Sequence, residues 1–574
     1  MRNVYVGIDL GLKGPHRASV YNPSEERYLD KSFSFGMSFE GFEYLLEEVH
    51  TRISSEDECS VSFVMEPTGM AWMPLSCFLV SRGYRVYRVT TQKSSDLRKF
   101  LDKHTKSDRT DAQALAKLPV VAKEKVYELY LPSSELGTLS RKTRHLAKLT
   151  QQAASRKTRI ENLFAMINLG ALGAFGEQKF HPGGKVFFKY FSNPFAIIEF
   201  GKEGFFRRFR ELCSTQVADS VLEKIYQASV STTRIYEPMV QTETLPFSFQ
   251  ETEKEICIEL DLLDHEERKI AELEKEILTL YRTIDPEGYL MTPQGIGPTI
   301  APAILGIIGD VSRFPNIDAF RAYFGFIPKK KQSSSREKKG MGIHKAAQGL
   351  LKKYLFLAAE VARQYDPEFA AFYDRLMKKG HHHYQAVCAL ANKMAGRLYA
   401  LLNRMQRAEG SRYVSSTSTI QPSQLLQPRE VGYKLRDLDG RIIDKKEARR
   451  IVLERFPSKS QRRQNAAAKR TSSTPKKRQQ GKSGESSTSL QPLSGQPRQL
   501  PKYFRDNSSK RSEKTLPAGI ILKDTFPELF VQSQIDDDWD QLKKFQDEQE
   551  DRVQNLVSVN KLCTGGEKKS EKRS

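Results

Sequence analysis

The chain has 574 residues, and its 92 lysines and arginines exceed its 70 aspartates and glutamates, which gives a net charge of +22. This length allows roughly three or four domains, and the excess of cations predicts a polyanionic partner such as a nucleic acid. A membrane protein is disfavoured, because there is no run of about eighteen apolar residues and no signal-peptide core. We therefore expect a cytoplasmic protein that binds nucleic acid. Six scattered cysteines without a Cys-x-x-Cys pair indicate neither a zinc knuckle nor a disulfide framework.

The N-terminal region alternates short apolar runs with helical stretches. Strands are predicted at 4–10, 17–20, 28–35, 60–65 and 84–89, and helices at 38–49 and 74–81. This pattern predicts an α/β domain with a mixed sheet flanked by helices. Asp9 lies near the end of the first strand, and Glu66 directly follows the fourth. Ligands of open α/β sheets bind beyond strand ends, so both acids are candidate site residues.

Two further acids, Asp108 and Asp111, stand three residues apart at the start of a predicted helix and would share one helical face. Four clustered carboxylates repel one another unless cations neutralise them. We therefore predict that Asp9, Glu66, Asp108 and Asp111 bind Mg²⁺ or Mn²⁺. Two such ions about 3.5–4 Å apart commonly serve to cut phosphodiesters. The structural alternative is that these acids cap turns or lie on a solvated helix face.

The middle of the chain is predicted to be helical. Residues 134–169 combine an apolar stripe with many cations, which suits either a phosphate-facing helix or a solvated one. Aromatic residues across 187–209 favour a small helical core. A heptad repeat across 251–284 predicts a long coiled-coil helix that pairs with the basic helix of its own chain or with a second protomer. The heptad positions are Ile256, Leu263, Ile270, Ile277 and Ile284.

Two glycine- or serine-containing segments follow. Gly295 and Gly297 precede an apolar helix at 299–308, as in helix-hairpin-helix modules whose backbone N–H groups bind phosphate. The basic segment 327–343 contains three consecutive serines, and a serine hydroxyl among cations is suited to meeting a phosphate. Its serines are Ser333, Ser334 and Ser335, and its candidate nucleic-acid-binding cations are Lys329, Lys330, Lys331, Arg336 and Lys338.

After residue 407 the composition changes to serine, glutamine, lysine, arginine and proline, which predicts a largely disordered basic tail. We therefore expect four regions. They are an acidic metal-binding nuclease domain at 1–130, a helical and coiled-coil region with an insertion at 131–289, a mainly helical C-terminal domain at 290–407 and the tail at 408–574.

With these motifs in this order, residues 1–405 resemble the DEDD transposases of bridge-RNA-guided insertion sequences, a family that includes Piv-type DNA invertases. The resemblance implies a RuvC-like domain of RNase H fold that contributes Asp9, Glu66, Asp108 and Asp111, then a coiled coil and a helical transposase domain with a serine nucleophile. The matching serine is Ser334, with Ser333 as the alternative. This chain has Ser335 where the family has glycine and His344 where it commonly has threonine or serine. The implied partners are donor and target DNA, a guide RNA and further protomers in a homodimer or homotetramer.

Three other interpretations compete. Residues 7–11 also suit the first phosphate loop of an actin-like sugar kinase, but the second phosphate loop and the adenosine motif cannot be found. A Holliday-junction-type nuclease would use the four acids and leave the serine segment without a role. A purely structural nucleic-acid-binding protein would leave the acids unexplained, because clustered carboxylates repel phosphate in the absence of a metal.

Overall fold

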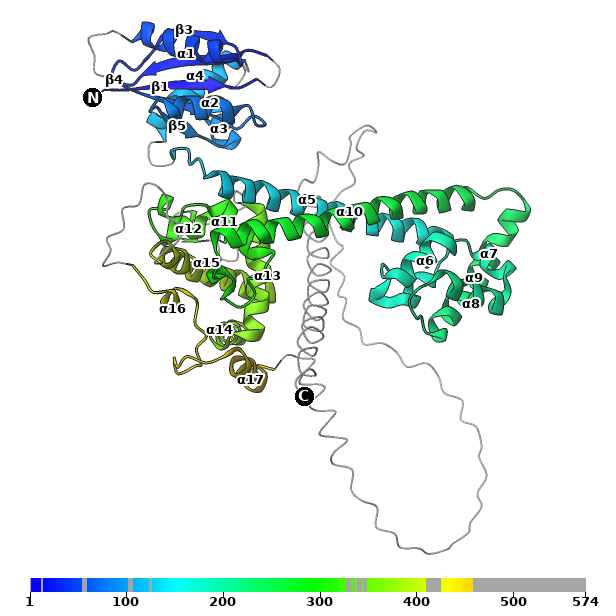
Figure 1. The fold of residues 1–574 in the computed structure, drawn as a ribbon. Coiled ribbons are helices and arrows are strands. Elements are labelled where there is room, and N and C mark those ends of the chain that lie inside the picture. The colour runs from blue at the N-terminus through cyan, green and yellow to red at the C-terminus, as the bar shows by residue number, and fades with distance from the viewer. Residues whose placement is uncertain are drawn as a thin grey trace, which may run out of the picture. The chain divides into compact units, whose positions relative to one another are not determined.

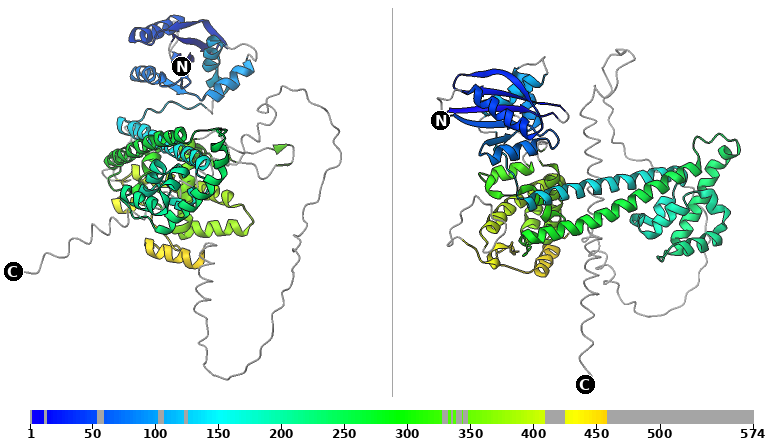
Figure 2. Two further views of the ribbon diagram at one scale, coloured as in Figure 1. Left: turned by 90° about the vertical axis from the view of Figure 1, so that its right-hand side faces the viewer. Right: turned by 45° about the horizontal axis from the view of Figure 1, so that its top comes forward.

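The computed structural model describes residues 2–11, 14–53, 59–101, 107–122, 126–326, 332–333, 336–337, 343, 348–408 and 425–457. The chain divides into two compact units, Met1–Ser133 and Ser134–Ser574. Within the described ranges, no helix is both long and apolar enough to span a bilayer. Figures 1 and 2 show the elements of each unit.

The N-terminal unit is built on a five-stranded mixed sheet in the order β3-β2-β1-β4-β5. The first three strands are antiparallel neighbours, whereas β1 pairs with β4, and β4 with β5, in parallel. The predicted mixed sheet is confirmed, and its order is RNase H-like. The strands are β1 (Arg2–Asp9), β2 (His16–Asn22), β3 (Arg27–Phe35), β4 (Cys59–Met65) and β5 (Arg85–Arg88).

Two helices cover each face of this sheet. The helices α1 (Phe39–Arg52) and α2 (Trp72–Ser81) pack with alternate residues of β1 and β4 into one core. The helices α3 (Thr91–Leu101) and α4 (Asp108–Val121) form a second core with Val64 on the opposite face. Because strand side chains alternate between faces, β1, β4 and β5 contribute to both cores.

Gly7 allows α4 to lie directly on β1. A Cβ atom at this position would lie 2.1 Å from the Ala112 carbonyl oxygen and 2.2 Å from the Ala116 nitrogen. Neither backbone atom can move away without shifting the helix. The glycine in the middle of β1 therefore fixes where α4 crosses the sheet.

The second unit is organised around two long helices, α5 (Ser134–Ile167) and α10 (Phe249–Ile284), which run side by side (Figure 1). They are antiparallel, because Lys142 pairs with Glu276 near one end whereas Arg159 pairs with Glu255 towards the other. The five heptad residues of α10 are all buried in the core that α5 shares. Of the two predicted pairings, the structure therefore has the one within the chain.

Ionic contacts replace apolar ones in part of this interface. Glu259 and Glu266 are only 9% and 8% exposed, and Arg156 of α5 binds both at 2.8 and 2.9 Å. Arg159 also binds Glu259, at 3.0 Å. Removing one partner would leave a buried carboxylate unpaired, so these contacts help to fix the register of the two helices.

At one end of the hairpin, a group of short helices forms the predicted aromatic core. Phe164 of α5 packs against Phe187 and Phe188, and Phe205 and Phe209 are likewise fully buried. The expectation that the aromatic stretch packs a core is thus confirmed. The elements are η2 (Ala171–Gln178), α6 (Pro182–Tyr190), α7 (Pro194–Glu199), α8 (Gly201–Leu212) and α9 (Asp219–Gln241).

At the other end, helices α11 to α15 pack around the start of α5 and the end of α10 (Figures 1 and 2). The elements are η3 (Tyr289–Met291), α11 (Ile300–Ile308), η4 (Val311–Arg313), α12 (Ile317–Phe324), α13 (Gly349–Tyr365), α14 (Pro367–Lys378) and α15 (His383–Gln406). A two-stranded ladder of β6 (Gln332–Ser333) and β7 (Arg336–Glu337) lies between α12 and α13 in the sequence.

The structure differs from the expected tail beginning at 408. Residues 425–457 contain α16 (Pro428–Val431) and α17 (Lys445–Arg455), and α17 packs against α13 and α14. Tyr433 donates a hydrogen bond of 2.7 Å to the buried carboxylate of Asp366. A polar, charged composition concealed this strap, which hydrogen bonds and a few separate buried residues such as Val431 and Val452 hold in place.

Candidate active site

Asp9 and Glu66 end two neighbouring parallel strands. Ile8 of β1 pairs with Met65 of β4, and the residue after each of them is an acid, Asp9 and Glu66 respectively. Parallel neighbours lie about 4.8 Å apart. Asp9 follows Gly7 by two residues and Glu66 follows Val64 by two, so continued alternation directs both acids to the face covered by α3 and α4. Both are partly buried.

The other two acids begin α4. Ser107 accepts a hydrogen bond from the Thr110 N–H, and the Thr110 hydroxyl accepts one from the Ser107 N–H, which forms a capping box. This cap places Asp108 and Asp111 in the first turn, where the helix dipole stabilises negative charge. Asp111 is partly buried beside the contact of α4 with β1, whereas Asp108 is exposed one turn earlier.

The helix α3 contributes two polar residues that the sequence analysis missed. The Ser94 hydroxyl donates a hydrogen bond to Oε2 of Glu66, and Nε of Arg98 lies 2.8 Å from Oδ1 of Asp111. The four-residue spacing puts Ser94 and Arg98 on one face of α3, so a single helix holds an acid from the sheet and an acid from α4. The only sequence signal for these two contacts was the four-residue spacing of Ser94 and Arg98, between β5 and the acidic motif.

The four acids therefore lie near one edge of the sheet without surrounding a common point. Within the described parts of the chain, no three acidic, histidine or cysteine side chains are close enough to hold one metal ion together. Their oxygen donors suit a hard divalent cation. Arg98 and Ser94 currently bind two of the carboxylates that such an ion would need.

The candidate serines lie in the second unit. Ser333 ends β6 and pairs with Arg336 of β7. Ser334 and Ser335 lie outside the described residues, as do Lys329, Lys330, Lys331 and Lys338.

The predicted phosphate-binding glycines have structural explanations of their own. Gly295 has a φ of 87°, and a Cβ there would lie 2.2 Å from the carbonyl oxygen of Ala358 in α13. The Gly297 carbonyl accepts hydrogen bonds from the N–H groups of Ile300 and Ala301 at the start of α11. Both glycines thus serve the turn into α11, whether or not they also meet a phosphate.

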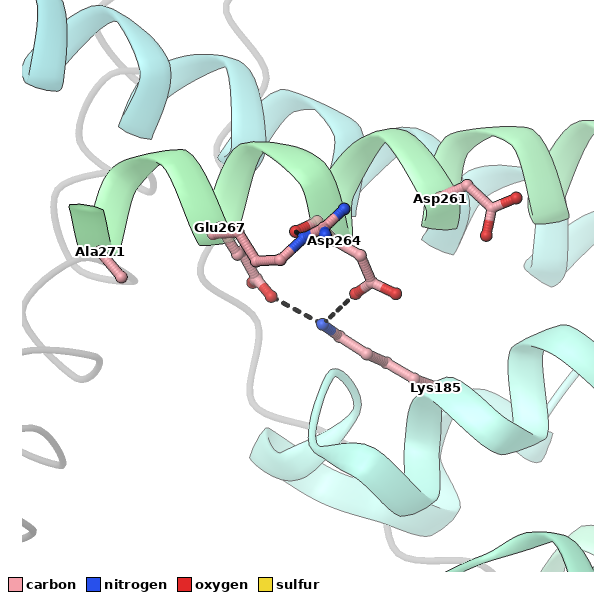
Figure 3. A pocket seen from close by; sticks show the side chains of 6 residues that line it. Lys185, Asp261, Asp264, Glu267 and Ala271 are labelled. Carbon is pink, nitrogen blue, oxygen red and sulfur yellow. Dashed lines mark hydrogen bonds and ion pairs between the residues drawn. The ribbon is translucent and has the colours of Figure 1, made fainter. Parts of the chain in front are cut away.

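A separate acidic cavity of about 680 Å³ lies between α6 and α10 (Figure 3). Lys185 reaches across it to Asp264 and Glu267, at 2.6 Å from each. Burial alone would raise the pKa of Glu267, but hydrogen bonds and charge from Lys185 and Lys157 lower it overall. We interpret this cluster as the contact that joins α6 to the hairpin, because cations already neutralise its acids.

Two transposase family models match the chain. One, of the DEDD IS110 type, is described as a transposase and covers residues 6–168, which include the four acids. The other is described as the transposase IS116/IS110/IS902 family and covers residues 287–374, which include the serine segment. The first match includes α5, and the two matches flank α10 and the helices at the aromatic end of the hairpin.

Similar proteins come from several bacteria. The chain is 23% identical over 410 residues to an uncharacterized 43.6 kDa protein of insertion element IS110 from Streptomyces coelicolor, covering 70% of this chain and 94% of that protein. It is 30% identical over 181 residues to a probable family 20 transposase of Pseudomonas aeruginosa, covering 30% of this chain and 52% of that protein. It is also 29% identical over 150 residues to the pilin gene-inverting protein of Moraxella lacunata, covering 25% of this chain and 46% of that protein.

The family name implies catalysis with divalent metal ions and binding to DNA. The order of the two matched domains agrees with the acid-bearing sheet at the start of the chain and the helical unit behind it. The chain is a DEDD transposase of the IS110/IS116/IS902 family, an enzyme that cleaves and joins DNA strands.

Proposed function

We propose that this transposase cuts and rejoins DNA with the carboxylates of Asp9, Glu66, Asp108 and Asp111 and with a serine nucleophile. The observation that carries the proposal is the meeting of Asp9 and Glu66 at the ends of two paired parallel strands, beside the first turn of α4. Acids at strand ends are unfavourable unless a cation or a ligand compensates their repulsion. The site of a DNA-cleaving enzyme gives them a reason to be there.

The four acids would hold Mg²⁺ or Mn²⁺, which, when bound, would polarise the scissile phosphate and ease proton loss from the nucleophile. Ser94 keeps Glu66 oriented, and Arg98 neutralises Asp111 and limits repulsion among the acids. For Asp111 to act as a ligand, its carboxylate must exchange the Arg98 guanidinium for the ion. Arg98 is thus a positioning residue in this proposal.

The nucleophile in this proposal is Ser334, with Ser333 as the alternative. Its Oγ attacks phosphorus and forms a phosphoserine ester, while the bond from phosphorus to one bridging oxygen breaks and that oxygen leaves with a proton. The lost serine proton passes to a carboxylate or water. Cations of the same segment would stabilise the transition-state charge, namely Lys329, Lys330, Lys331, Arg336 and Lys338. Gly295 and Gly297 would add backbone N–H groups for DNA phosphates.

The proposal also includes a guide RNA and assembly into a homodimer or homotetramer. The net charge of +22 suits a polyanion, and the sequence motifs resemble those of RNA-guided transposases. Joining two duplexes requires more than one serine. Sequencing the RNA that co-purifies with the protein tests the guide, since its loops should be complementary to two DNAs.

Trapping on a nicked suicide duplex tests the chemistry. We expect denaturation-resistant protein on the cut strand, with the DNA-linked peptide mapping to Ser334 or Ser333. An adduct elsewhere would contradict the serine assignment. Strand cleavage without any adduct would favour the second candidate, a junction nuclease that uses the four acids alone.

A further inference from the structure

The charges on α5 divide into a neutralised set and an available set. Between residues 136 and 160 this helix has seven lysines and arginines and no acid. Lys142, Arg156, Lys157 and Arg159 all pair with glutamates of α10. Among the described residues, the remaining three have no carboxylate within ion-pair distance. They are Arg141, Arg144 and Lys148, and all are exposed.

The antiparallel hairpin explains this division. The acids of α10 stop at Glu276, which is the partner of Lys142. The first half of α5 lies against the last part of α10, where no further acid follows before Ile284. The available cations therefore gather at the end of the hairpin that packs with α11 and α13, away from the acidic surface of α10.

The three cations form one stripe. Arg141, Arg144 and Lys148 are spaced by three and four residues and therefore share a helix face. The buried residues Leu139, Thr143 and Leu146 lie on the opposite side of α5. The stripe thus points away from the core, and its three side chains are exposed.

One hydrogen bond links the stripe to the start of α13, the helix after the serine segment. Arg144 donates a hydrogen bond of 3.4 Å to Oε1 of Gln348, the N-cap residue of α13. Gln348 is the fifth residue after the serine-bearing segment 327–343, and its side chain makes no cap hydrogen bond. The stripe therefore lies beside the start of α13, the helix that follows the serine-bearing segment in the sequence.

We infer that Arg141, Arg144 and Lys148 form a binding surface for the phosphate backbone of the DNA strand that is being cut. The inference rests on the proposed function, because it takes the serine segment as the place where the strand is attacked. Three unpaired cations along about 10 Å of helix match the spacing of successive phosphates, which lie several ångströms apart. Their role is to position the strand, since phosphate contacts fix register without reading sequence.

The test compares two triple variants of the full chain. Arg141→Gln with Arg144→Gln and Lys148→Gln removes the stripe. The control, Lys142→Gln with Arg159→Gln and Lys254→Gln, removes three charges that are already paired with glutamates. Binding to a random-sequence DNA duplex is measured over a series of salt concentrations, with circular dichroism as the check on folding.

We expect the stripe variant to lower the slope of log affinity against log salt by about 2 to 3, since each lost phosphate contact removes about 0.9. The control should keep the slope of the unsubstituted protein. Equal slopes for both variants would overturn the inference. A slope that falls with single-stranded RNA but not with DNA would also overturn it and assign the stripe to RNA.

The suicide-duplex experiment separates this inference from the proposed function. If the unsubstituted protein forms the adduct but the two triple variants give equal salt slopes, only the DNA-binding role of the stripe is contradicted. No adduct despite strand cleavage contradicts the serine mechanism on which the inference rests.

Discussion

Arg98 is the residue whose role in the candidate site is most specific. It holds Asp111 at 2.8 Å, and both side chains are largely shielded, with 17% and 26% exposure. The Arg98 guanidinium repels a metal ion that approaches Asp111 and occupies Oδ1 of the Asp111 carboxylate. We therefore expect Arg98→Ala to bind Mn²⁺ on the order of tenfold more tightly, as measured by the paramagnetic signal of free Mn²⁺.

The matched control is Arg109→Ala, which removes an exposed arginine from the first turn of α4. It should change Mn²⁺ affinity little, because an exposed charge is screened by solvent. If Arg98→Ala bound Mn²⁺ more weakly, Arg98 would stabilise the metal-bound site as well as the metal-free one. That result would contradict the exchange of the Arg98 guanidinium for the ion at Asp111.

His16 should make the N-terminal unit sensitive to mild acid. It is fully buried, its Nδ1 accepts a hydrogen bond of 3.2 Å from the Gly11 N–H, and burial lowers its pKa below the usual 6.5. Between pH 6.5 and the lower folded-state pKa of His16, the unfolded chain therefore binds more protons than the folded one. Stability is retained above pH 6.5 and is lost as the pH falls from 6.5 through the folded-state pKa.

Trp72 reports this effect, because the chain has only one other tryptophan, Trp539, and Trp539→Phe removes it. In that background the urea midpoint from Trp72 fluorescence should fall between about pH 7.5 and about pH 5.5. His16→Gln should flatten this dependence even if it lowers the midpoint overall. An equally steep dependence in His16→Gln would assign the effect to other groups.

At the scale of elements, the heptad residues of α10 form an interface with α5 of the same chain. Ile270 and Ile277 are 5% and 1% exposed within the interface of α10 and α5. Aspartate at both positions should therefore destabilise the chain itself, by on the order of 3–5 kcal/mol for each unpaired buried charge. If the heptad instead paired with a second protomer, the same substitutions would dissociate an assembly. Circular dichroism and thermal unfolding measure the destabilisation.

The same helix offers a matched control. Ile258 and Leu262 are exposed at 59% and 41%, one turn apart on the outer side of α10. Aspartate at both positions should leave the helical content unchanged. If sedimentation shows that this outer pair dissociates an oligomer while the fold survives, protomers meet on the outer face of the hairpin. A fully folded Ile270→Asp, Ile277→Asp variant would contradict the intrachain interface.

Element by element, the sequence predicted what periodicity and strand ends determine. Short apolar runs and alternating residues identified the five strands, and the seven-residue repeat identified α10, because these patterns follow from burial. Asp9 and Glu66 could be selected because an acid after an apolar strand is unusual. Ser94 and Arg98 could not be selected, since serine and arginine are ordinary on a helix surface until the neighbouring chain is known.

At the scale of the whole molecule, the strap at 425–457 extends the folded part of the second unit beyond the predicted boundary. Tyr433 lies at the centre of this contact. Its hydroxyl donates to Asp366, which is 1% exposed, and its N–H donates to the Thr292 hydroxyl at 2.7 Å. Composition alone could not predict the strap, because hydrogen bonds and a few separate buried residues such as Val431 and Val452 attach it, without a continuous apolar run.

Tyr433→Phe should lower the stability of the second unit by about 1–3 kcal/mol, because Asp366 loses a hydrogen bond in a buried position. Thermal unfolding of the full chain is the measurement, with Tyr190→Phe as the control at an exposed tyrosine. A chain ending at residue 424 should be destabilised more strongly, and one ending at residue 457 should not. Equal stability of the two truncated chains would show that the strap contributes nothing.

The central claim is that the acids at the end of the N-terminal sheet form the metal site of the transposase. Replacing Mg²⁺ by Fe²⁺ and adding ascorbate and peroxide generates radicals that cut the backbone beside the bound ion, independently of DNA cleavage. We predict cuts near residues 9, 66, 94–98 and 108–111, and their loss in Asp9→Asn with Asp111→Asn. Cuts confined to the acidic cavity lined by Asp261, Asp264 and Glu267, or cuts that persist unchanged in that double variant, would contradict the claim.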